Sequence, residues 1–179
     1  MVTAEDALYL YQTLTAHGIQ LWLTGGWGID ALLGEQTRPH KDMDILLRLE
    51  DIPRMCALLE ADGFQLHELW SENRWVTDAQ EKETATAFVL QDDSGRQVDA
   101  HALCLDQQGN GIPAWEDDEG RVFKPQDLAG EGMIAGISVP CISAEMQFAC
   151  HTGYTLPDYQ QHDLERLRRH RAQAAGKPE

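Results

Sequence analysis

The chain has 179 residues, close to the usual size of one domain and too short for two large independent cores. Hydrophobic residues make up 42% of it, which supports a packed core, and no apolar run approaches the ~20 residues of a membrane-spanning helix. Thirty acidic residues against fourteen Lys and Arg give a formal charge of -16, a field that repels nucleic acid. The same charge would attract a cationic small molecule, although acidity also serves solubility.

Two features of the sequence indicate the compartment. No basic-apolar-small signal pattern opens the chain, so we expect a cytoplasmic protein with no membrane partner. The four cysteines show no C-x-x-C spacing, which favours reduced, mostly buried thiols over a zinc or redox centre.

Helix and strand patterns alternate in the first part of the chain. Apolar spacing, β-rich runs and glycine stops predict a helix over 5–17, a strand over 19–24, a short helix over 27–33, a strand over 43–49 and a helix over 51–63. This order is typical of an α/β layer rather than of a helix bundle.

A β-hairpin is predicted next. Residues 84–103 contain two β-rich arms around the turn sequence Asp-Asp-Ser-Gly. The second arm carries Asp99 and His101. Both side chains should project to the same face of the hairpin, because side chains alternate along a strand.

The last third of the chain is more polar. Its segments are predicted as a surface loop or short hairpin at 107–120, a hairpin at 132–142, a helix from an N-cap at Ser143 through 149, and a final helix at 157–171 before a frayed tail.

The expected fold class is α/β (α+β), with a mixed sheet flanked by helices and a small C-terminal segment. We divide the chain into a core at 1–106 and, at 107–179, a C-terminal hairpin and helical extension that completes a binding pocket.

Gly25-Gly26-Trp27 follows a strand and opens a helix. Without a Cβ, glycine lets backbone N–H groups approach an anion, and the start of a helix adds aligned donors, so this turn can hold a triphosphate. The chain lacks both the P-loop and the dinucleotide-binding glycine patterns. A purely structural strand-to-helix turn is the alternative.

Asp42 and Asp44 stand two positions apart at the start of a strand. They project from one face and can bind the same hard cation through oxygen. Without a cation, two neighbouring carboxylates repel each other. The alternative is an ordinary solvated pair of acids at a strand edge.

The glycines and the aspartates are predicted to meet. Fifteen residues separate Gly26 from Asp42, enough for one helix and a return to the same sheet edge, and Asp99 on a later strand supplies a third acid. Three carboxylates beside a phosphate site suit metal-assisted nucleotidyl transfer, with Asp99 as the general base. Arg38 and His40 are candidate phosphate contacts, and we expect Lys41 to be solvated.

Three runs of sequence resemble a known family. GGWGIDALLGEQTRPHKDMDI, VDAHAL and PCISAEMQFACHTGYTL are similar to the small antibiotic nucleotidyltransferases of the polymerase-beta-like superfamily. The likeness is greatest to the lincosamide nucleotidyltransferases, is weaker to the aminoglycoside 2''-nucleotidyltransferases, and covers most of residues 8–170.

The resemblance implies a nucleotidyltransferase fold and assigns roles to particular residues. Gly25 and Gly26 would bind the nucleotide phosphates, Asp42 and Asp44 would hold Mg²⁺, and Asp99 would complete the acidic trio. Many members of the superfamily have Ser where this chain has Trp27, which removes a hydroxyl contact to phosphate. The small antibiotic enzymes also carry Trp there, so the difference narrows the subgroup.

The resemblance also implies a reaction. The chain would move AMP from ATP, or another nucleotide, to a hydroxyl of a lincosamide such as lincomycin or clindamycin, release pyrophosphate and inactivate the drug. A homodimer is an open alternative to the monomer. The rival functions are an aminoglycoside nucleotidyltransferase and a non-catalytic or toxin-antitoxin module with the same fold.

The acceptor site is less well defined. His101, His151 and Tyr154 are candidate substrate contacts, although a buried strand histidine and a helix end with a packed tyrosine are equally plausible. Three tryptophans provide flat apolar surfaces that can serve either an acceptor site or core packing: Trp70, Trp75 and Trp115. The acidic loop at 116–119 is expected to be solvated.

Overall fold

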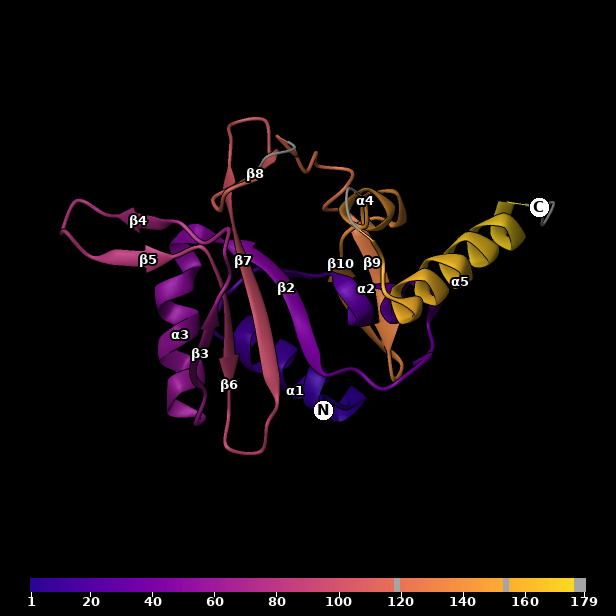
Figure 1. Cartoon of the computed structure of the whole chain (residues 1–179), viewed down its shortest axis with the longest axis horizontal. Coiled ribbons are helices and arrows are strands. Elements are labelled where there is room, and N and C mark those ends of the chain that lie inside the picture. Colours follow the sequence, from indigo (N-terminus) through magenta and orange to yellow (C-terminus); the bar gives the residue numbers. More distant parts are fainter. Residues whose placement is uncertain (118–119, 153–154, 176–179) are drawn as a thin grey trace.

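The computed structural model describes residues 1–117, 120–152 and 155–175, which form a central mixed sheet flanked by helices (Figure 1). The helices are α1 (Ala4–Ala16), α2 (Gly25–Leu33), α3 (Ile52–Ala61), α4 (Ala144–Cys150) and α5 (Asp158–Ala175), with a 3-10 turn at Leu49–Asp51. The strands are β1 (Leu21–Leu23), β2 (Asp42–Arg48), β3 (Gln65–Leu69), β4 (Trp75–Thr77), β5 (Glu83–Ala85), β6 (Ala87–Gln91), β7 (Gln97–Leu105), β8 (Gly111–Pro113), β9 (Gly130–Ile134) and β10 (Ile137–Cys141).

The main sheet joins strands that are distant in sequence. Its order is β3-β6-β7-β2-β1-β10-β9, with β8 paired to β7, while β4 and β5 form a separate two-stranded sheet. The pairs β2–β7 and β1–β10 are parallel and the others are antiparallel. This is the predicted mixed sheet, and the two parallel pairs bring segments from both ends of the chain to its centre.

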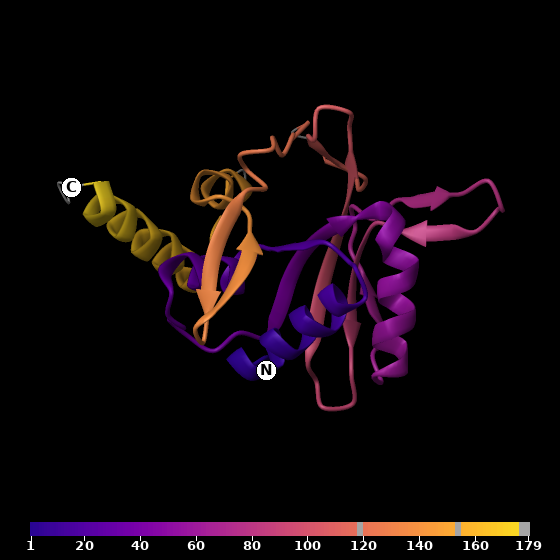
Figure 2. The same cartoon turned by 180° about the vertical axis from the view of Figure 1, so that it is seen from behind.

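Side-chain alternation gives the two faces of the sheet different tasks. One face is apolar and packs under α1 and α3, which lie in front of the sheet in Figure 2; it carries Met43, Ile45 and Leu47 of β2 and Val98, Ala100 and Ala102 of β7. The opposite face begins with acids and continues into a second apolar cluster; it carries Asp42, Asp44 and Leu46 of β2 and Asp99, His101 and Leu103 of β7. The predicted acids therefore lie away from the main core.

Local signals account for several helix ends. Thr3 and Asp6 form a reciprocal capping box at the start of α1, and the Ser143 hydroxyl accepts the Met146 N–H at the start of α4, 3.1 Å away. Gly34 ends α2 in the left-handed conformation, with φ 75°. The predicted N-cap at Ser143 is confirmed.

Two parts of the chain differ from the sequence prediction. Residues 64–83 were assigned no element, yet they form β3 and β4 and begin β5, and the predicted first arm of the hairpin is divided between β5 and β6. All five residues of β3 are exposed, and its register shifts between Leu66 and Glu68, so the strand lacks an alternating apolar pattern. None of the four cysteines forms a disulfide, and of the four only Cys141 is fully buried, so the expectation of mostly buried thiols is wrong.

The C-terminal region contributes to the same sheet and to one long helix. β9 and β10 belong to the same sheet as the strands of residues 1–106. The division at residue 106, with a C-terminal part that completes a binding pocket, stays a prediction. α5 packs Leu164 and Leu167 on Ile29 of α2, and its second half extends away from the body (Figure 1). Among the described residues, no helix is both long and apolar enough to cross a membrane.

Candidate functional site

A cavity of about 470 Å³ lies where α2 begins beside β2 and β7. Its lining includes the predicted glycines and aspartates: Gly25, Gly26, Asp42, Asp44 and Asp99. Residues that are far apart in the sequence therefore face one space, as the spacing argument predicted.

Strand pairing explains why the acids converge. In the parallel pair β2–β7, Asp44 lies directly opposite Asp99, and Asp42 precedes Asp44 by two residues on the same face. The pairing leaves three carboxylates on neighbouring positions of one sheet face. Among the described residues that line the cavity, no basic side chain neutralises all three carboxylates.

The electrostatic cost of this crowding appears in the acid pKa values. Burial raises the pKa of Asp44 well above its usual range, and the charges of Asp42 and Asp99 raise it further. Burial also raises the pKa of Asp42, again with Asp99 adding to the shift. Both groups are costly to ionise in the protein alone, and a bound cation would remove much of that cost.

Asp42 and Asp44 suit a divalent cation better than the complete trio does. Within residues 1–117, 120–152 and 155–175, no three His, Cys, Asp or Glu side chains are arranged to hold a metal ion. Asp99 already has protein partners: its Oδ1 accepts the Trp70 indole N–H at 2.9 Å and lies 3.3 Å from His101 Nδ1. Mg²⁺ is commonly held by one or two carboxylates with substrate phosphates, so two acids on one strand fit an open site.

The two glycines are required by close packing against side chains of the same chain. Gly25 has φ 55°, and a Cβ there would collide with the Asp44 carboxylate. A Cβ at Gly26 would collide with the His40 ring and with Arg38 Nη2. The Gly26 N–H donates to Asp44, which offsets part of the rise in that pKa. The glycines therefore let β2, with Asp44, lie against the start of α2.

His40 and Trp27 are buried, with 2% and 1% of their surfaces exposed, and neither lines the cavity. His40 Nε2 lies 2.5 Å from Asp30 Oδ2, and the centre of its ring lies 4.7 Å from that of Trp27, with the two planes tilted by 44°. Asp30 also accepts the backbone N–H and the hydroxyl of Thr37. The geometry gives His40 a supporting position behind Gly26, and direct contact of either side chain with phosphate stays a prediction.

Arg38 lines the cavity, but its guanidinium is bound to α5. Nε and Nη2 donate to the Asp163 carboxylate, with Nη2 2.8 Å from Oδ2, while Nη1 donates to the Pro39 carbonyl. The group also lies 4.7 Å from the centre of the Tyr159 ring. A phosphate at Arg38 would share this guanidinium with Asp163. Lys41 is exposed as predicted, yet it also lines the cavity.

The candidate acceptor residues separate into two places. His151 lines the cavity, and its Nδ1 lies 2.7 Å from the Gln147 carbonyl. His101 lies beside Asp99 and Glu72 and packs edge-on against Trp115. Burial lowers the pKa of His101, but the bonds to Asp99 and Glu72 outweigh it and raise that pKa to about 9. Tyr154 lies outside the described residues.

Sequence reasoning did not identify three cavity residues by role. Tyr159 and Asp163 belong to α5, where the visible pattern was a run of basic residues, and no local signal marks their contact with Arg38. Trp70 was predicted only as a flat apolar surface. Its indole bond to Asp99 follows from the pairing of β3, β6 and β7.

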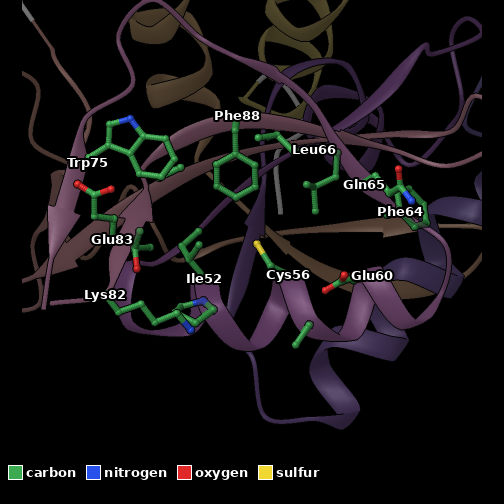
Figure 3. Close-up of a pocket in the computed structure, with 15 residues that line it drawn as sticks. Ile52, Cys56, Glu60, Phe64, Gln65, Leu66, Trp75, Lys82, Glu83 and Phe88 are labelled. Atoms are coloured by element: carbon green, nitrogen blue, oxygen red, sulfur yellow. The ribbon is translucent and has the colours of Figure 1, made fainter. Parts of the chain in front are cut away.

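A larger cavity of about 520 Å³ lies elsewhere in the molecule. It is bounded by α3, β3, β6 and the β4–β5 hairpin, and its wall is mainly apolar, including Cys56, Leu66 and Phe88 (Figure 3). Glu60, Lys82 and Glu83 supply its charged groups. It contains none of the three aspartates, so size does not identify the site of the chemistry.

Comparisons with known proteins agree with this geometry. A family model described as Aminoglycoside-2''-adenylyltransferase matches residues 7–167. A lincosamide resistance protein of Staphylococcus haemolyticus is 27% identical over 167 residues, which cover 93% of this chain and 95% of that protein.

Two solved structures have the same fold. The lincosamide antibiotic adenylyltransferase LnuA, lincomycin-bound, has a TM-score of 0.75 and 26% identity, covering 93% of this chain and 97% of its own. ANT(2'')-Ia in complex with adenylyl-2''-tobramycin has a TM-score of 0.66 and 21% identity, with 97% and 89% covered. At that lower identity the second likeness supports the fold alone. The predicted fold class is confirmed.

Replacing Gly26 with Ala should destabilise the protein by about 1–3 kcal/mol and sharply reduce activity, because the new methyl group meets the buried, bonded His40 ring. Chemical unfolding and turnover measure the two effects. Gly18→Ala is the control: φ 73° makes it strained, but a Cβ there meets nothing within 4 Å. It should lower stability and leave activity intact. Equal activity in both variants would contradict the packing argument.

Asp44→Asn should make the metal-free protein more stable at pH 8, by on the order of 1 kcal/mol, because it removes a repelled carboxylate. Folding raises the Asp44 pKa, so the folded state loses stability as the pH rises above the ordinary carboxyl value and through the raised one. The gain from Asn should therefore shrink as the pH falls. Urea unfolding across pH, with and without Mg²⁺, provides the measurement. A less stable variant at pH 8 would contradict the repulsion.

Proposed function

Because the chain belongs to the Aminoglycoside-2''-adenylyltransferase family, we propose that it transfers AMP from ATP to a hydroxyl group of a lincosamide antibiotic and releases pyrophosphate. It is an antibiotic nucleotidyltransferase by its family and by relatives that match nearly its whole length. The proposal adds to this the nucleotide, the acceptor and the roles of individual residues.

One observation carries the proposal. Asp42, Asp44 and Asp99 face a single cavity together with the start of α2, and two of these acids have pKa values raised by burial and mutual repulsion. Acids crowded together at a cavity lower the stability of the fold, and groups with such perturbed pKa values cluster at functional sites. A divalent cation that binds together with the nucleotide would supply the missing positive charge.

The residues divide the chemistry between them. Asp42 and Asp44 would hold the divalent cation, Mg²⁺ in our proposal, which neutralises phosphate charge when bound. Asp99 would take the proton of the acceptor hydroxyl as that oxygen bonds to the α-phosphorus. The bond from the α-phosphorus to the bridging oxygen breaks at the same centre, and pyrophosphate leaves. Since Asp99 Oδ1 is already bonded to Trp70, Oδ2 would receive the proton.

The cavity also contains groups suited to the two substrates. Gly25 and Gly26 at the start of α2, with Arg38 and Lys41, would face the nucleotide phosphates. His151 and Trp70 line the same cavity and are available to the acceptor. We retain Tyr154 and His101 as proposed substrate contacts, of which His101 reaches the site through Asp99.

We prefer a lincosamide over an aminoglycoside as the acceptor because the lincosamide relative matches a much larger share of this chain. The lincosamide resistance protein matches 93% of this chain, whereas a 2''-aminoglycoside nucleotidyltransferase of Klebsiella pneumoniae is 37% identical over only 33% of it. The description of the family model and the formal charge of -16 keep a polycationic aminoglycoside as the second candidate. A cytoplasmic location and a homodimer remain part of the proposal.

Incubation with ATP, Mg²⁺ and lincomycin or clindamycin should release pyrophosphate and add the mass of one AMP unit to the drug. Asp42→Asn should lower turnover at least about 100-fold with the fold unchanged by circular dichroism, because one cation ligand is lost. Asp93→Asn is the matched control, since Asp93 is an exposed acid on the β6–β7 turn.

The acceptor panel separates the remaining functions. Turnover with tobramycin and not with lincosamides would select the second candidate. An absence of turnover with every acceptor and nucleotide would favour the non-catalytic module. Full activity in Asp42→Asn would remove that residue from the cation site.

A further inference from the structure

We propose that Trp70 is a positioning residue, whose indole N–H fixes one carboxylate oxygen of Asp99 and so presents the other oxygen to the acceptor hydroxyl. The inference rests on the proposed role of Asp99 as the base. It goes beyond that role by naming what orients the carboxylate. It also gives the segment after β3 a place in the reaction.

The contact itself is specific. Trp70 Nε1 donates to Asp99 Oδ1 over 2.9 Å, a normal length for such a bond, and joins residues 29 apart in sequence. His101 Nδ1 lies 3.3 Å from the same oxygen. In the described part of the chain no hydrogen bond reaches Oδ2. The two oxygens of Asp99 therefore have different surroundings, and one of them is committed.

The backbone around Trp70 is tied down. Its N–H donates to the Ala87 carbonyl of β6, and its own carbonyl accepts the Asn73 N–H. The Asn73 side chain in turn accepts the N–H groups of Thr86 and Ala87. This turn is anchored to β6, the strand that pairs with β7 beside Asp99. The backbone that carries the indole is therefore held by its own hydrogen bonds and by those of the Asn73 side chain.

The same turn holds the second partner of Asp99. Glu72 Oε1 lies 3.6 Å from His101 Nε2, and Trp115 packs edge-on against that ring. Trp70 and Glu72 thus act from one short segment on the same oxygen of Asp99, Trp70 directly and Glu72 through His101. An indole suits the first position because it is a rigid donor that neither binds a metal ion nor accepts the proton.

Trp70 also lines the cavity, so a wall for the acceptor is the competing account. The two accounts differ in what they change. A wall contributes to binding and would alter the KM of the acceptor, whereas a group that orients the base alters kcat. The experiment must therefore remove the N–H and keep an aromatic ring at this position.

Trp70→Phe meets this requirement. We expect kcat to fall about 10- to 100-fold, with the KM values for ATP and the acceptor changed by less than about three-fold, because a misdirected base costs rate rather than affinity. Trp22→Phe is the matched control. Its indole N–H donates to the Leu128 carbonyl at 2.7 Å, so it also loses one bond, but Trp22 does not line the cavity. Its kcat should stay within about three-fold of the parent. A kcat for Trp70→Phe within that range, or a change confined to the acceptor KM, overturns the proposal.

A second measurement does not depend on turnover or on the folding of the Trp70 variant. The chain has five tryptophans, so it should give five indole N–H signals by NMR, assigned through the backbone. The Trp70 signal should be the one that shifts most, and exchanges faster with solvent, in Asp99→Ala, and should change little in Asp42→Ala. An unchanged Trp70 signal in Asp99→Ala overturns the positioning role. If the Trp70 signal shifts in Asp99→Ala as expected but the parent protein turns over no acceptor, the result would count against the proposed function and not against the contact.

Discussion

Repulsion between carboxylates on one face of the sheet is the constraint on which the site depends. Parallel pairing of β2 with β7 places Asp44 opposite Asp99, and alternation adds Asp42 to the same face. The acids cannot turn to the other face of the sheet to separate their charges, because that face of both strands belongs to the main core. The acids instead face a cavity, where a cation and a polyphosphate can compensate one another. That arrangement agrees with the chain's membership of a family of antibiotic nucleotidyltransferases.

The groups around the acids serve to hold them close to the start of α2. Gly25 and Gly26 have no Cβ where Asp44 and His40 come closest, and the Gly26 N–H donates to Asp44. His40 is fixed by the buried Asp30. The double glycine that suggested a phosphate site is thus required first by the protein's own packing, and the same close approach leaves the helix start open to the cavity.

The three acids are not equivalent. Asp42 and Asp44 share a strand and have raised pKa values, whereas Asp99 is bonded to Trp70 and lies beside His101. This asymmetry is the basis for proposing that Asp42 and Asp44 bind the cation and that Asp99 takes the proton. α5 lines the same cavity with Tyr159 and Asp163, which both contact Arg38, so residues from the last helix and from the start of the chain face one space.

The sequence by itself determined the local features: strand and helix periodicity, the shared face of Asp42 and Asp44, and the N-cap at Ser143, because each depends on neighbours within a few residues. Only the tertiary structure decided the partners. Arg38 meets an acid 125 residues away, and Trp70 meets Asp99 through the pairing of three strands, one of them exposed and without an apolar pattern. Such contacts join single polar residues of different elements, and a single contact leaves no periodic pattern in the sequence, unlike the buried face of a helix or strand.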